Sequence, residues 1–296
     1  MTRALVLGGG GPVGIGWESG LAVGLASRGV DIAASEAIYG TSAGSFVGAQ
    51  LALGLDIAEA VARLTETRGV VLPSNDASAP MADRMQALMT AITEAALSDA
   101  PPEEGRQAIG RLSLQAEVPS EEEFLGVFAV LEGLEFPERF GCTAVDTATG
   151  EFVLWRTGSD ADLWHAVASS CAVPCVYPPV SIGGRRYMDG GMRSALNADV
   201  AVGHDRVLAV SCTLLALPED MSNPLFDALM GGLADEMATL KSSGSVVEVI
   251  EPNQEFLEIS GWGTALMDIS KAADAYAAGI SQGVEESERI AGLWNR

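Results

Sequence analysis

The sequence predicts an α/β fold, in which helices connect the buried strands of a central sheet. Short apolar segments recur along the chain, and several are followed by a glycine turn and a helical pattern. Short apolar runs bounded by turns are typical of buried strands, so we assign these segments to the sheet. Hydrophobic residues make up 48% of the 296 residues, which is ample for a large core. A chain of this length could hold one large α/β domain or two small ones.

Two units of strand, turn and helix open the chain. The strands are expected at 4–7 and 37–39, the glycine turns at 8–14 and 40–44, and the helices at 15–28 and 43–53. Both turns follow strand ends, so we expect them to lie on neighbouring strands of the sheet.

The next region, at about 70–134, has a helical pattern only. Pro101-Pro102 starts one segment, and Ser120 with Glu123 forms a capping box ahead of another. We interpret this region as a helical insertion between parts of one sheet.

Strand patterns return after residue 140. A hairpin is expected from strands at 142–145 and 152–155, and further strands are expected at 185–188, 207–212 and 246–250. Helices are expected at 160–171, 222–240 and 264–292.

The charge of the chain limits its partners. It has 40 Asp and Glu against 17 Lys and Arg, a net charge of -23. Phosphates of nucleic acids need Lys and Arg, so we expect no nucleic-acid partner and no electrostatic attraction to anionic lipid. Contact with a membrane would be apolar and at most peripheral.

Residues 1–3 lead directly into the first expected strand, which leaves no room for a signal peptide. No apolar run approaches the roughly 18 residues of a membrane span. We therefore expect a cytoplasmic protein. The cysteines form no C-x-x-C pair and have no nearby histidine cluster, so we expect buried free thiols and no metal site. They are Cys142, Cys171, Cys175 and Cys212.

The second glycine turn, Gly40-Thr41-Ser42-Ala43-Gly44, places a serine between a strand and a helix. This geometry exposes a serine hydroxyl at a sharp bend and directs the helix N-terminus at developing negative charge. The alternative is structural, with the hydroxyl of Thr41 or Ser42 capping the helix.

The first glycine turn has three interpretations, one of which is a tight turn that binds no ligand. Its backbone N–H groups are suited to an oxyanion hole. Gly9, Gly11 and Gly14 also satisfy the G-x-G-x-x-G fingerprint of dinucleotide-binding proteins. That fingerprint expects an acid at the end of the second strand, whereas Glu36 opens that strand. An oxidoreductase of this class therefore stays a minor alternative.

A nucleophilic serine needs a base, and the chain has only two histidines. His165 lies in an apolar helical pattern. His204 follows Ser42 and Asp189 in the order of an α/β-hydrolase triad. Asp189 is the stronger candidate, because Gly190 and Gly191 allow a close approach to its carboxylate; a solvated Asp-Gly turn is the alternative.

The glycine run, the serine turn and Asp189-Gly190-Gly191 occur in this order, and together they resemble the patatin-like phospholipase family. The stretch Ala168-Ser169-Ser170-Cys171-Ala172-Val173-Pro174 adds to the likeness. The resemblance covers residues 3–54 and about 139–213.

The resemblance implies a patatin-like α/β fold of three layers (α/β/α), with a central, mostly parallel sheet in a single domain over residues 1–296. It also implies a lipid acyl hydrolase with a serine–aspartate dyad, which needs no histidine, metal or cofactor. Ser42 would attack a lipid or small ester substrate and Asp189 would take its proton. The implied oxyanion donors are Gly10 and Gly11, with Gly9 or Ala43 as an additional candidate. The implied motif glycines are Gly14, Gly40, Gly44, Gly190 and Gly191.

One residue departs from the family pattern. Val13 stands where the family usually has Arg or Lys, which removes a positive charge but leaves the backbone donors intact. Val13 favours a second hypothesis, a catalytically weak or inactive protein of this fold that binds lipid.

Methionines in the helical insertion have two interpretations. They line an acyl-chain groove or form a lid over Ser42, or they belong to an ordinary core. The helical repeat consists of Met81, Met85, Leu88, Met89 and Ile92.

Overall fold

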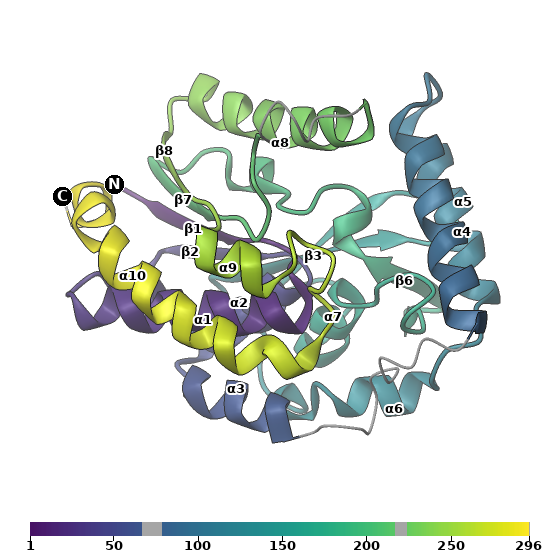
Figure 1. Ribbon diagram of the computed structural model, residues 1–296, viewed down its shortest axis with the longest axis horizontal. Helices are drawn as coiled ribbons and strands as arrows, with labels where there is room; N and C mark the ends of the chain where they lie inside the picture. The colour runs from purple at the N-terminus through teal and green to yellow at the C-terminus, as the bar shows by residue number, and fades with distance from the viewer. Residues whose placement is uncertain (67–78, 217–223, 296) are drawn as a thin grey trace.

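A mixed sheet forms the centre of the computed structural model, which describes residues 1–66, 79–216 and 224–295 (Figure 1). Within these residues the sheet has eight strands in the order β5-β6-β3-β2-β1-β7-β8, with β4 paired to β3. The strands are β1 Arg3–Leu7, β2 Ala37–Gly40, β3 Phe140–Asp146, β4 Phe152–Arg156, β5 Val180–Ile182, β6 Arg185–Asp189, β7 Arg206–Val210 and β8 Val246–Ile250. The pairs from β3 through β2, β1 and β7 to β8 are parallel, and the pairs of β3 with β4, β3 with β6 and β5 with β6 are antiparallel.

Helices form the outer layers, and Figure 1 shows α8 on one side of the sheet and α1, α2 and α10 on the other. The α-helices of the described residues are α1 Gly11–Ser27, α2 Ala43–Leu53, α3 Ile57–Glu66, α4 Ala79–Ala96, α5 Pro102–Gln115, α6 Glu121–Gly126, α7 Leu163–Ser170, α8 Pro224–Ser242, α9 Gln254–Ile259 and α10 Ala272–Trp294. The three-layer α/β/α prediction is therefore confirmed.

Side chains of the central strands alternate between the two layers. In β1, Leu5 and Leu7 join the large core cluster that includes α1 and α2. Ala4 and Val6 join a second cluster that includes Leu233 of α8. Because each strand buries both of its faces, its sequence is apolar without alternation.

The edge of β3 brings two strand ends together. Residues 141–145 pair with β4 along one edge, so β2 and β6 must share the other. On that shared edge β2 ends with Gly40 opposite Cys142, and β6 ends with Asp189 opposite Ala144. Since β2 and β6 run in opposite directions, their carboxyl ends meet, and the turns that follow them are neighbours.

Glycines allow α1 and α10 to pack backbone to backbone. A Cβ atom at Gly16, Gly20 or Gly24 would overlap carbonyl oxygens of α10, and one at Gly279 would overlap the Trp17 carbonyl of α1. This spacing of four residues places the three α1 glycines on one helix face. The close packing fixes α1, whose N-terminus belongs to the glycine run.

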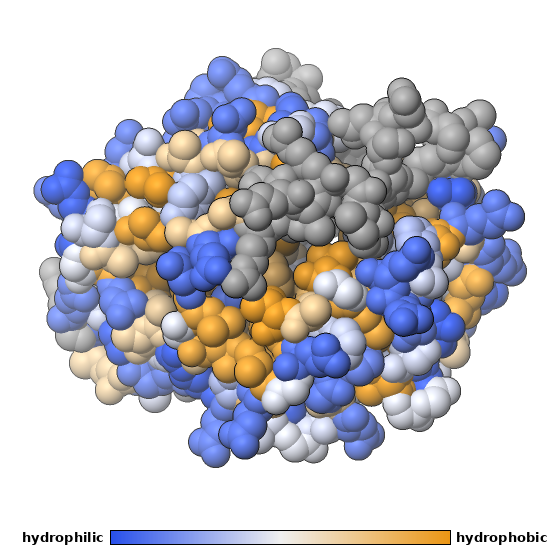
Figure 2. Space-filling model, turned by 90° about the horizontal axis from the view of Figure 1, so that it is seen from below, coloured by the Kyte–Doolittle hydropathy of each residue, from blue (hydrophilic) through white to orange (hydrophobic). Residues whose placement is uncertain are grey.

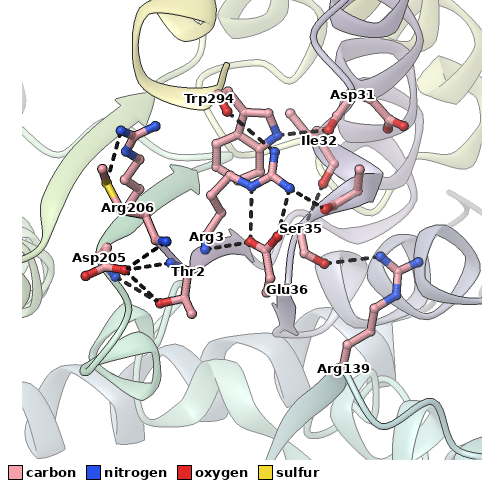
Figure 3. A network of polar contacts seen from close by, with 12 residues as sticks. Thr2, Arg3, Asp31, Ile32, Ser35, Glu36, Arg139, Asp205, Arg206 and Trp294 are labelled. Carbon is pink, nitrogen blue, oxygen red and sulfur yellow. Dashed lines mark hydrogen bonds and ion pairs between the residues drawn. The ribbon is translucent and has the colours of Figure 1, made fainter. Parts of the chain in front are cut away.

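The amino ends of β1 and β2 are joined by a polar network (Figure 3). Arg3 forms an ion pair with Glu36 at 2.9 Å and its guanidinium lies over the Trp294 ring, with 5.4 Å between the guanidinium carbon and the ring centroid. The hydrogen bonds from Arg3 lower the pKa of Glu36 to about 2. Glu36 is therefore paired with Arg3 at the amino ends of the strands, whereas the glycine turns follow the carboxyl ends.

Most expected elements are present, with two differences. Helix α1 begins at Gly11, before the expected residue 15, because Pro12 fits the first turn of a helix. The expected helix at 264–292 is wrong in its first part, since α10 begins at Ala272, 264–267 form turns and Ile269–Lys271 form a short 3₁₀ helix. Residues 70–78 of the expected insertion and 222–223 of the expected α8 lie outside the described residues. Within the described chain, no helix is both long and apolar enough to cross a membrane.

The contact between α1 and α10 leads to a stability prediction. Gly20→Ala is expected to lower the free energy of unfolding by about 1–3 kcal/mol, because the new methyl group overlaps the Tyr276 carbonyl and α10 must shift. Urea unfolding at 25 °C measures the change. Gly292→Ala, in open space on α10, is the control and should leave stability equal or slightly higher. Equal stability of the two variants would contradict the close packing.

Candidate active site

Ser42 lies at a sharp turn between β2 and α2. Its backbone has φ 52° and ψ -118°, a conformation that is strained for a residue with a side chain. A Cβ atom at Gly40 would overlap the Gly44 carbonyl, and one at Gly44 would overlap the Leu7 carbonyl. The sharp turn therefore requires both glycines of the motif.

Hydrogen bonds to the main chain hold Ser42 in this conformation. Its N–H donates to Ser170 Oγ at 3.0 Å. Its carbonyl accepts from Ser45 Oγ at 2.7 Å and from Cys171 Sγ at 3.1 Å. The Ser42 side chain makes no capping bond to α2, so its hydroxyl does not serve the structural role of a helix cap.

Asp189 lies at the end of β6 and meets Ser42. Its carboxylate accepts a 2.7 Å hydrogen bond from the Gly191 N–H, and the Ser42 side chain lies near enough to lower the pKa of the carboxyl. The side chain is only 2% exposed, so it is not a solvated turn residue. Burial raises the pKa of Asp189 to about 7, although the Gly191 hydrogen bond and the nearby Ser42 side chain oppose the shift.

The glycine run passes directly beside Ser42. A Cβ atom at Gly9 would lie 3.5 Å from the Ser42 Cβ. The Gly9 N–H donates to the Ala195 carbonyl at 2.7 Å, so it is not free to bind an oxyanion, in contrast to the sequence-based expectation. In the described chain, the N–H groups of Gly10, Gly11 and Ala43 have no protein acceptor.

An apolar cavity of about 400 Å³ opens onto Ser42. Aromatic rings form one wall, where Phe124 stacks on Tyr177 at 4.6 Å and meets Phe128 edge-on at 5.3 Å between ring centroids. Gly11 and Ala43 also line the cavity, so two of the candidate oxyanion donors face the same space as the serine. Figure 2 views the molecule from below and shows hydrophobic residues gathered near the middle of this face.

The helical insertion contributes to the cavity through its last part only, as far as the described residues go. The wall includes residues 124 and 126–130. Met85, Leu88 and Ile92 of α4 instead pack in a small cluster with Ile109 and other residues, which is the core interpretation. Met89 is half exposed, and the side chain of Met81 lies outside the described residues.

Both histidines lie away from Ser42. His204 precedes β7, whereas Ser42 follows β2, and these strands run in the same direction as β1 between them. His204 therefore lies at the amino ends of these strands, away from the carboxyl ends that carry Ser42. Its ring faces Tyr39, and its Nδ1 contacts the Ala201 carbonyl at 3.0 Å. His165 pairs with Asp162 at 2.8 Å. The arrangement does not support a triad that includes His204.

The position of Val13 is fully buried. Its side chain joins the main core, and its N–H donates to the Leu266 carbonyl at 3.2 Å. A charged side chain in this place would need a buried partner. The four cysteines are free and buried, as expected, and burial raises the pKa of Cys142, Cys171 and Cys212.

Sequence reasoning missed the residues that support the two turns. Ser170 binds the Ser42 main chain, Thr143 Oγ1 pairs with Thr41 Oγ1 at 2.8 Å, and Asn197 bonds to Thr41 at 3.1 Å. Each of these residues lies 54 to 156 positions along the chain from the residues it bonds in the Ser42 turn and in β3. Local periodicity carries no signal for such contacts.

One comparison with known proteins, the match to a family model, agrees with the resemblance of the motifs. The family model for patatin-like phospholipase matches residues 5–202, which include Ser42 and Asp189. No curated protein matches the sequence. Among solved structures, VipD from Legionella pneumophila is similar with 13% identity and a TM-score of 0.38, over 99% of this chain and 80% of VipD. The type III effector protein ExoU is similar with 16% identity and a TM-score of 0.42, over 97% of this chain and 53% of ExoU.

The family model spans the sheet from β1 to β6, both glycine turns and the acid that meets Ser42. It covers well over half of the chain, and its matched segment contains every motif of the candidate site. The chain belongs to the patatin-like phospholipase family.

Proposed function

We propose that this chain is a serine hydrolase that cleaves carboxylic ester bonds of lipids, with Ser42 as nucleophile and Asp189 as base. The observation that carries the proposal is the buried Asp189 carboxylate, which lies close to Ser42 beside an apolar cavity. An ordinary aspartate is a weak base for a hydroxyl, but a base with a pKa of about 7 is matched to neutral pH. Membership of the family supports lipid hydrolysis as the reaction class.

The proposed reaction has two halves. Ser42 Oγ attacks the ester carbonyl while Asp189 takes the hydroxyl proton, and the N–H groups of Gly10, Gly11 and Ala43 are the candidate donors to the oxyanion. Collapse of this intermediate breaks the ester bond, and Asp189 returns the proton to the leaving alkoxide. Water then attacks the acyl-serine with Asp189 taking its proton, and the bond between Ser42 Oγ and the acyl carbon breaks. Asp189 returns the proton to Ser42 Oγ, and the carboxylic acid leaves.

The cavity and the charge of the molecule favour particular substrates. Aromatic and aliphatic walls favour an apolar acyl chain over a polar one. The net charge of -23 disfavours anionic bilayers, so we propose dispersed, monomeric or neutral esters as substrates and at most peripheral membrane contact. We further propose that the insertion at 70–134, whose last part lines the cavity, acts as a lid.

A second candidate function is lipid binding without efficient turnover. The observation that favours it is Val13, a buried apolar residue where the family usually has a basic one. Both functions use the same cavity, and they differ in whether Ser42 is acylated.

The nucleophile and base are tested together by labelling with a fluorescent serine-reactive phosphonate and by hydrolysis of a short-chain ester. Ser42→Ala is expected to abolish labelling, and both Ser42→Ala and Asp189→Asn should lower kcat by at least about 10³-fold. His204→Ala, at the amino ends of the strands, should retain wild-type kcat.

Three outcomes would change the assignment. Labelling that survives in Ser42→Ala would eliminate Ser42 as the nucleophile. Equal losses in folded His204→Ala and Asp189→Asn would replace the dyad with a triad. Wild-type protein that binds the ester without labelling or hydrolysis would establish the second candidate function.

The pKa of Asp189 leads to a prediction for activity. Only the ionised carboxylate accepts the Ser42 proton, so kcat/KM is expected to rise about tenfold per pH unit below pH 7 and to level off above it. Initial rates from pH 5 to pH 9 with a non-ionising ester measure the profile. An inflection near pH 4 would show that Asp189 titrates as an ordinary exposed carboxyl.

The same shift predicts how stability depends on pH. Asp189 binds its proton more tightly when folded than when unfolded, so wild-type stability should fall relative to Asp189→Asn as pH rises from about 4 to 7. The difference in the free energy of unfolding between wild type and Asp189→Asn should change by about 4 kcal/mol over this pH range, since each pKa unit corresponds to roughly 1.4 kcal/mol. Urea unfolding of both proteins at several pH values measures it, and a constant difference would contradict the raised pKa.

A further inference from the structure

Asn197 is a buried amide between the two turns of the candidate site. Its side chain is 0% exposed, and its backbone is left-handed with φ 53° and ψ 39°. Asparagine tolerates this conformation better than most residues with a side chain. The side chain makes no helix-capping bond, so its polar atoms serve other partners.

The amide nitrogen of Asn197 bonds to both turns. It donates to Thr41 Oγ1 at 3.1 Å and to the Gly190 carbonyl at 3.2 Å. A third acceptor, the Ser194 carbonyl, lies at 2.7 Å. Thr41 directly precedes Ser42, and Gly190 directly follows Asp189, so one side chain joins the neighbours of both candidate catalytic residues.

Arg193 determines which way the amide faces. Its Nη1 donates to Asn197 Oδ1 at 2.8 Å and to Asp199 at 2.9 Å. A guanidinium has no acceptor, so the oxygen of the amide must face Arg193 and the nitrogen must face the two turns. The ion pair with Asp199 in turn holds Arg193 in place.

We infer that Asn197 is a positioning residue of the Ser42–Asp189 dyad, which it holds together through Thr41 and Gly190; this inference rests on the proposed hydrolase function. Proton transfer needs the two side chains at hydrogen-bond distance, and a misplacement of about 1 Å costs on the order of 10²-fold in rate. Strand pairing brings the turns near each other, and Asn197 sets their separation.

The decisive variant is Asn197→Asp, which keeps the shape and the oxygen facing Arg193 but removes both N–H donors. We expect kcat for the short-chain ester to fall about 10- to 100-fold while KM stays within about twofold, since Asn197 does not line the cavity in the described chain. Asn253→Asp is the matched control. Asn253 caps α9 through its oxygen, which accepts from the Phe256 N–H at 3.0 Å, so its kcat should equal that of the wild type.

Thr41 provides an independent test that does not alter the buried amide. Thr41→Val removes the hydroxyl at nearly constant shape and is expected to lower kcat about tenfold, whereas Thr41→Ser keeps the hydroxyl and should restore wild-type kcat. The double variant that combines Thr41→Val with Asn197→Asp should lose less activity than the two single losses in kcat predict together. Both changes remove the hydrogen bond between the Asn197 amide and the Thr41 hydroxyl.

The outcomes separate this inference from the proposed function. Wild-type kcat in folded Asn197→Asp, or equal kcat in Thr41→Val and Thr41→Ser, overturns the role of Asn197 while Ser42-dependent turnover remains. If Asn197→Asp does not fold, the two Thr41 variants decide alone. Turnover that persists in Ser42→Ala overturns the proposed function and the inference with it.

Discussion

The pairing of two strands along one edge of β3 is the constraint on which the candidate site depends. β2 runs parallel to β3 and ends opposite Cys142, and β6 runs antiparallel to β3 and ends opposite Ala144. The two strand ends therefore meet, and Ser42 and Asp189 approach each other although they are far apart in the chain. A change of register in either strand by one residue would also reverse which face each side chain occupies.

Two features of the site oppose folding and depend on the surrounding structure. Ser42 has a strained backbone, and Asp189 is a carboxyl kept from water. The sheet, buried on both faces, and the close contact of α1 with α10 hold the turns that carry these residues. The same burial that costs stability gives the carboxyl a pKa of about 7, so stability and basicity are linked at Asp189.

The molecule combines an acidic surface with an apolar cavity. Its net charge of -23 gives no attraction to anionic membranes, whereas the cavity beside Ser42 is lined by aromatic and aliphatic side chains. Segments far apart in the chain build this cavity: α2, the end of the helical insertion, residues after α7, and Met267 near α10. The last of these lies beyond residue 202, so part of the cavity wall falls outside the segment matched by the family model.

The sequence by itself determined the fold class, the order of most elements, and the two glycine turns with Ser42 and Asp189. These features follow from local patterns, because apolar runs mark buried strands and glycines mark turns that no other residue can form. The sequence placed a helix over residues 264–271 and left Gly9 as an oxyanion donor, and both expectations depended on contacts made elsewhere in the chain. Only the tertiary structure decided three features. The Gly9 N–H bonds to the Ala195 carbonyl, His204 lies at the amino ends of the strands, and Asn197 lies between the turns. Such contacts join residues far apart in the chain, and their distances are set by strand register and helix packing, for which a single sequence carries no local signal.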